Sequence, residues 1–229
     1  MNEPESNSGD LMTADDGHAG DGSGGAGPPD ARIVRVLGEQ FLEPPDRDRV
    51  DAVGRWAAEW RRTAEDLPPE FEAALDRIVE GADADEETLR TAYTHLFRGV
   101  SQRAPEPPYE SMYVDGQFYG ETATEIKQGY RWAGVDVDDA RGNEPPDHLG
   151  LELQFLGELV GMAARGEGPP EVDVAEARGW LLEDHLVEWV PTYHARIQQE
   201  DPPEYYAGLL DLTLAVVRHH HRRHAENER

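Results

Sequence analysis

The chain has 229 residues, enough for one medium-sized domain with a tail, and 48 acidic against 21 basic residues give a formal net charge of −27. Such a charge repels nucleic acids and anionic membrane surfaces, and the absence of cysteine excludes disulfides, cysteine-ligated zinc and thiol catalysis. Lys127 is the only lysine, and acidic, lysine-poor surfaces are typical of a high-salt cytoplasm, so the composition indicates a protein of halophilic type.

The first 30 residues predict a disordered acidic tail. They carry seven acids and no base, and Gly, Ser and Asp dominate, so this segment has almost nothing to bury. It also lacks the basic and then apolar pattern of a secretory signal, and no apolar run in the chain approaches the roughly 20 residues of a membrane span. We therefore expect a tail over 1–30, one folded domain over 31–229, and a soluble, cytoplasmic protein without stable membrane insertion.

Apolar residues recur at helical spacing from residue 31 onward, and proline or glycine separates the segments. No run alternates with period two for long enough to predict a strand with confidence, and the only hairpin-like candidate is "SMYVDGQFYG" at 111–120. The pattern thus predicts an all-α, single-domain bundle of about seven to nine helices. The expected helical segments are 31–42, 46–60, 68–81, 85–99, 117–134, 144–159, 174–198 and 202–225.

The segment 144–159, "EPPDHLGLELQFLGEL", predicts the central helix of the bundle. Its prolines suit a helix start, and Asp147 is expected in the first turn, where the helix dipole favours an anion. His148 and Glu152 are four residues apart and share a face, at the rim of the core. Two apolar sides then follow, and a helix that is apolar on two sides is buried; these sides are Leu149, Leu153, Leu156 and Val160, and Leu151, Phe155, Leu159 and Met162.

The segment 174–198 predicts a long helix with His185 and Trp189 on one apolar face, and we interpret both as core residues. Pro191 is expected to kink or end this helix. The run "RHHHRRH" near the C-terminus is interpreted as a solvated helix end, because cations are favourable near the last carbonyl groups; metal binding is the alternative.

Three motifs in this order resemble the TorD/DmsD/NarJ family of cytoplasmic chaperones for molybdenum-containing oxidoreductases. They are "PPYESMYVDG", "EPPDHLGLELQFLGEL" and "LLEDHLVEWVPTY", and the resemblance covers roughly residues 85–195. It implies an all-helical fold, no catalysis and no cofactor. The implied partner is the precursor of a molybdoenzyme catalytic subunit, and family members can exchange helices between subunits, so either a monomer or a domain-swapped dimer is expected.

In this family the chaperone binds the twin-arginine signal peptide and the apo-form of an oxidoreductase of the dimethyl sulfoxide, trimethylamine N-oxide or nitrate reductase type. It aids cofactor insertion and delays export. Carried over to this sequence, the resemblance implies two peptide-binding segments, namely Glu144, Pro145, Asp147 and His148, and Tyr109, Ser111 and Tyr113.

A twin-arginine peptide requires carboxylates beside an apolar, aromatic groove. Glu144, Asp147 and Glu152 are the candidates for the charge. Candidates for the groove are Tyr109, Tyr113 and Phe155, with Trp56, Trp60 or Trp132. A helical metalloenzyme, with His148 and Glu152 or His185 and Glu188 as ligands, and a generic peptide-binding adaptor remain as alternatives. The Asp147–His148 pair can also be a simple helix start, and no metal is predicted.

Overall fold

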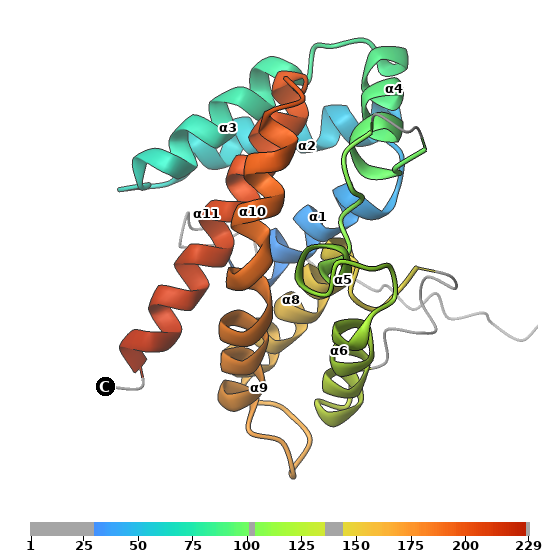
Figure 1. Ribbon diagram of the computed structural model, residues 1–229. Coiled ribbons are helices and arrows are strands. Elements are labelled where there is room, and N and C mark those ends of the chain that lie inside the picture. Colours follow the sequence, from blue (N-terminus) through green and yellow to red (C-terminus); the bar gives the residue numbers. More distant parts are fainter. Residues whose placement is uncertain (1–29, 101–103, 136–143, 228–229) are drawn as a thin grey trace, which may run out of the picture.

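The computed structural model describes residues 30–100, 104–135 and 144–227, and these ranges form an all-helical bundle (Figure 1). The helices are α1 (Ala31–Leu42), α2 (Arg47–Thr63), α3 (Pro69–Gly81), α4 (Glu86–Phe97), α5 (Glu110–Val114), α6 (Glu121–Trp132), α8 (Leu149–Arg165), α9 (Val174–Trp180), the π-helix η1 (Leu181–Leu186), α10 (Val187–Gln198) and α11 (Glu204–Asn227).

The all-α prediction is confirmed. Because α9, η1 and α10 are continuous and form one helix, the described ranges contain nine helices. This agrees with the predicted seven to nine. No strand is formed in the described ranges, Tyr109 and His148 form an isolated bridge, and the hairpin candidate at 111–120 forms α5 and a turn instead. No helix in these ranges has the length and apolarity to cross a membrane. The predicted tail, apart from Asp30, lies outside the described residues.

Aspartates begin several of the helices. The side chains of Asp30, Asp46, Asp85 and Asp173 accept hydrogen bonds from backbone N–H groups of α1, α2, α4 and α9. Each such cap satisfies donors that have no partner within the helix and stabilises the helix start by about 1 kcal/mol. Part of the chain's acidity therefore serves local structure.

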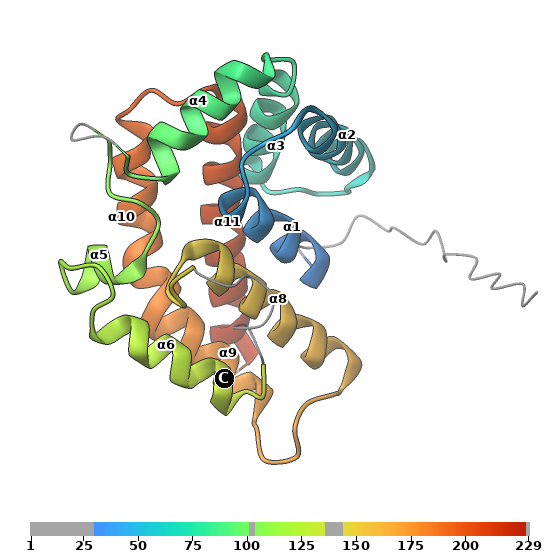
Figure 2. The same ribbon diagram turned by 90° about the vertical axis from the view of Figure 1, so that its right-hand side faces the viewer.

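Helix α8 is central, as the sequence predicted. Both of its apolar sides are buried except for Val160 and Met162, which are half-buried. It crosses α1 closely (Figure 2), because Gly38 and Gly150 allow the two backbones to meet; a Cβ atom added at either glycine would lie 2.6 Å from the other residue's carbonyl oxygen. This crossing fixes the N-terminal end of α8, where the candidate site begins.

The helix over 174–198 does not end at Pro191, which lies inside α10. The irregularity falls before the proline, where Leu181–Leu186 form a π-helix. Proline cannot donate the usual backbone hydrogen bond, and π segments often occur at functional positions. Here the π segment carries His185.

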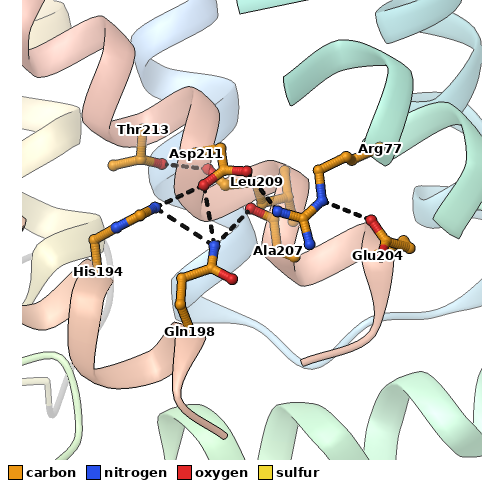
Figure 3. Close-up of polar contacts among 8 residues, drawn as sticks. All are labelled: Arg77, His194, Gln198, Glu204, Ala207, Leu209, Asp211 and Thr213. Atoms are coloured by element: carbon orange, nitrogen blue, oxygen red, sulfur yellow. Dashed lines mark hydrogen bonds and ion pairs between the residues drawn. The ribbon is translucent and has the colours of Figure 1, made fainter. Parts of the chain in front are cut away.

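Asp211 of α11 joins three helices in one polar cluster (Figure 3). Its carboxylate accepts hydrogen bonds from Arg77 of α3 at 2.7 Å and from Gln198 of α10 at 3.0 Å, and it lies 2.6 Å from Nε2 of His194. Arg77 also donates to Glu204 at 2.6 Å. Partial burial by itself favours the neutral acid, but the contacts with His194 and Arg77 dominate and lower the pKa of Asp211.

Replacing Asp211 by Asn is expected to lower the free energy of unfolding by about 1 kcal/mol, because acceptors remain but the charge-assisted bonds are lost. Because the folded pKa is depressed, this contribution is present above the ordinary pKa of 3.8 and is lost as the pH falls through the folded value. Urea denaturation at pH 7 and at pH 3 measures it. An equal difference between wild type and variant at both pH values contradicts the assignment.

Candidate functional site

The segment from Glu144 to His148 packs against the start of α5. The N–H of Glu110 donates to the carbonyl of Asp147 at 2.9 Å, and the N–H of Leu149 donates to the carbonyl of Pro108 at the same distance. The bridge between Tyr109 and His148 lies between these two bonds. The structure thus brings together the two segments that the sequence singled out, although more than 30 residues separate them in the chain.

Asp147 and His148 are both fully buried, and the expectation that they lie at the rim of the core is wrong. Helix α8 begins only at Leu149, so Asp147 precedes the helix instead of lying in its first turn. Its Oδ2 accepts from the N–H of Ser111 at 3.0 Å, and Ser111 is buried as well. Asp147 therefore holds α5 against α8, a role that no periodicity in the sequence indicates.

His148, not Asp147, is the N-cap of α8. Its Nδ1 accepts from the N–H of Gly150 at 3.0 Å. Burial lowers the pKa of His148 to about 4, so the ring is neutral at pH 7 and Nδ1 is free to accept. Within the described part of the chain, Nε2 of His148 and Oδ1 of Asp147 have no hydrogen-bond partner.

Glu152 and Glu110 place two carboxyl groups in the core. Oε2 of Glu152 accepts from Nε1 of Trp189 at 3.1 Å, and both oxygens of Glu110 lie 3.0 Å from Nδ1 of His185. Burial raises the pKa of Glu152 well above its usual value, and the neighbouring charges of Glu110 and Asp147 raise it further. Burial also raises the pKa of Glu110, against the opposing effect of His185. We call Glu110, Ser111, Asp147, His148, Glu152, His185 and Trp189 the buried network.

Glu144 lies closer to the surface and already has partners. Its carboxylate accepts from Arg98 at 2.7 Å and from the hydroxyl of Tyr109 at 2.8 Å. Its partial burial by itself favours the neutral acid, but these bonds dominate and lower its pKa. The sequence did not indicate Arg98, because a single arginine at the end of a helix carries no pattern.

The two tyrosines proposed for the aromatic groove, Tyr109 and Tyr113, are half-buried, and their rings contact other side chains of the protein. Tyr109 packs on His148 and Phe118, and Tyr113 packs on Trp189 and Tyr193. Pro145 is buried. The other residues predicted for the groove differ in exposure: Phe155 and Trp60 are buried, Trp56 is half-buried, and Trp132 is exposed. Of the aromatic candidates, Trp132 is the most exposed.

A groove of about 600 Å³ lies between α6 and the α9–η1 helix, beside the buried network. Its walls carry Glu125, Trp132, Glu176, Trp180, Asp184 and His185. His185 belongs to both the network and the groove. The sequence analysis missed all of these except Trp132 and His185, because three acids among 48 have no distinguishing pattern. A larger hollow of about 720 Å³ lies along α4, and it shares no residue with the network.

The C-terminal histidines differ from the expectation of a solvated helix end. His220 and His224 are buried against the bundle, and burial lowers the pKa of His220 to about 4. Among the described residues, no group of three His, Asp or Glu side chains is arranged to hold a metal ion. His148 binds the start of its own helix and His185 binds Glu110, so the described geometry does not favour the ligand pairs of the metalloenzyme alternative.

Comparison with known proteins agrees with the resemblance seen in the sequence. Residues 64–195 match the family model described as nitrate reductase delta subunit. The chain is 30% identical over 148 residues to the chaperone protein TorD of Vibrio vulnificus, covering 63% of this chain and 67% of that protein. It is 32% identical over 146 residues to TorD of Vibrio cholerae (63% and 65%) and 24% identical over 201 residues to TorD of Shewanella piezotolerans (81% and 87%).

By its architecture the protein is a helical bundle in which a buried polar network adjoins an open groove. The matches identify its relatives as chaperones and not enzymes, as the sequence predicted. The chain belongs to the TorD/NarJ family of redox enzyme maturation chaperones.

Proposed function

We propose that the protein is a cytoplasmic chaperone that binds the twin-arginine signal peptide of a molybdenum-containing oxidoreductase precursor. It holds the apo-enzyme until the cofactor is inserted and delays export. The class of client proposed is an oxidoreductase of the dimethyl sulfoxide, trimethylamine N-oxide or nitrate reductase type. Membership of the family and the relatives' name of chaperone protein TorD support the chaperone role, and the family description as nitrate reductase delta subunit supports a client of the nitrate reductase type.

The observation that carries the proposal is the position of His185, which connects the buried network to an acidic, aromatic groove. A signal peptide offers two arginines followed by an apolar segment, and such a ligand requires carboxylates next to apolar surface. The groove has three carboxylates and two indoles. A buried network of polar groups, costly unless its members are paired, keeps the surrounding helices in one arrangement.

The site residues expected from the sequence then have two different roles in the proposal. Glu144, Tyr109 and Tyr113 retain exposed surface and contact the client beside α5. The others are buried and hold α5, α8 and η1 in register for the client; these are Ser111, Pro145, Asp147, His148 and Glu152.

A synthetic peptide with a twin-arginine motif and an apolar stretch is expected to bind the full-length protein with micromolar or tighter affinity, which corresponds to about −8 kcal/mol. Isothermal titration calorimetry measures it. The control peptide has both arginines changed to glutamine and the apolar stretch scrambled. Equal affinity for both peptides would exclude signal-peptide recognition.

A further inference from the structure

The charged groups lining the groove between α6 and the α9–η1 helix are carboxylates, and the amide of Gln128 lies beside them. Glu125, Glu176 and Asp184 are exposed carboxylates, and among the described residues no lysine or arginine lines the groove. His185 is only 3% exposed, and its Nε2 has no hydrogen bond within the described residues. The three carboxylates make the groove complementary to a ligand that donates hydrogen bonds.

The three carboxylates of the groove form no ion pair with other described residues. Glu144 has a basic partner in Arg98, but Glu125, Glu176 and Asp184 form no ion pair in the described ranges. Three like charges around one hollow repel each other unless a cation lies among them. The arrangement therefore favours a cationic ligand.

The two indoles make the groove selective among cations. Trp132 is 41% exposed, and its ring centroid lies 6.5 Å from that of Trp180 in an edge-to-face arrangement. Trp180 in turn packs on His185 with ring centroids 4.3 Å apart. A planar guanidinium stacks on an indole face and donates in its own plane to carboxylates, whereas a lysine ammonium is compact and strongly hydrated. This combination matches arginine best.

Gly129 of α6 fixes the position of Trp180. A Cβ atom at this residue would lie 2.2 Å from the outer edge of the indole. The contact is with the far end of a side chain, so an alanine here moves the indole without forcing the two helices apart. Gly129 thus provides a way to change the groove without changing any charge.

We infer that this groove receives the guanidinium groups of the two consecutive arginines of the client signal peptide. The carboxylates of Glu125, Glu176 and Asp184 accept their hydrogen bonds, and Trp132 and Trp180 provide the stacking faces. The inference rests on the proposed function and goes further by naming the surface that reads the arginine pair.

The test uses the full-length protein with two ligands, the signal peptide and the dipeptide arginyl-arginine amide. Binding is followed by the NMR signals of the indole N–H groups, which also detect weak ligands. The triple variant Glu125→Gln/Glu176→Gln/Asp184→Asn and the variant Gly129→Ala are expected to weaken binding of both ligands, the triple variant by about tenfold or more, since exposed pairs contribute little singly. Glu87→Gln, at an exposed acid of α4 outside the groove, is the charge control and is expected to bind as wild type does.

Lysyl-lysine amide is expected to bind more weakly than arginyl-arginine amide and to cause smaller changes in the indole signals of Trp132 and Trp180. If the triple variant binds both ligands as wild type does, or if neither indole signal responds to either ligand, the groove assignment is overturned. If the groove assignment is overturned in this way but the signal peptide still binds the wild-type protein, the proposed function stands. If the dipeptide binds in the groove and the signal peptide does not bind at all, the groove remains an arginine site and the proposed function fails.

Discussion

Replacing His185 by Leu is expected to lower the free energy of unfolding by about 3–5 kcal/mol, because it leaves the carboxyl group of Glu110 buried without its partner. Glu110 is 1% exposed and has no access to water to replace the imidazole. Leucine retains apolar contact with Trp180, so packing alone does not account for a loss of this size. Urea denaturation followed by circular dichroism measures the change.

The control for this prediction is the double variant Glu110→Met/His185→Leu. Replacing both members of a buried pair by apolar residues of similar size is often neutral, so the double variant should recover most of the stability that the single variant loses. A single variant within about 1 kcal/mol of wild type contradicts the assignment of Glu110 and His185 as a buried pair. A double variant as unstable as the single one places the loss in packing instead.

Replacing Glu152 by Gln is expected to stabilise the protein at pH 8. Burial, with the charges of Glu110 and Asp147, holds the folded pKa of Glu152 well above its ordinary value of 4.5. Between these two values the folded state binds a proton that the unfolded state releases, so wild-type stability falls as the pH rises through this window. Glutamine has no such penalty and still accepts from Trp189. A tenfold change in the ionisation equilibrium of Glu152 corresponds to about 1.4 kcal/mol. The gain in the free energy of unfolding of the variant at pH 8 is expected to exceed this value.

Melting curves of wild type and Glu152→Gln between pH 5 and pH 8 test this prediction. The difference should be small at pH 5, which is close to the ordinary pKa of 4.5, and should grow toward pH 8, where the unfolded state has released this proton. Glu110 retains a raised pKa in both proteins, so some loss of stability with rising pH should remain in the variant. A constant difference across this range would contradict a buried, protonated Glu152.

Helix α8 and His148 at its start show which features could be predicted from the local sequence pattern. The two apolar sides of 149–162 predicted a central helix, because burial on both sides needs only the 3.6-residue period. The start of that helix was misplaced, since Pro145 and Pro146 suit a helix start and an anion such as Asp147 suits the first turn. Only the contact with Ser111, 36 residues away, shows that Asp147 binds another segment instead.

The sequence by itself determined the helical class, the order and extent of most helices, and the family, because all three depend on local periodicity and on contiguous motifs. Only the tertiary structure decided which polar residues are buried and which are open. Glu152 and Glu110 come from α8 and α5 and meet in the core, whereas Glu125, Glu176 and Asp184 come from three helical segments and line one groove. Their positions depend on how close the helices approach, as at Gly38 with Gly150 and at Gly129 with Trp180, and that distance is set by packing between segments far apart in the chain.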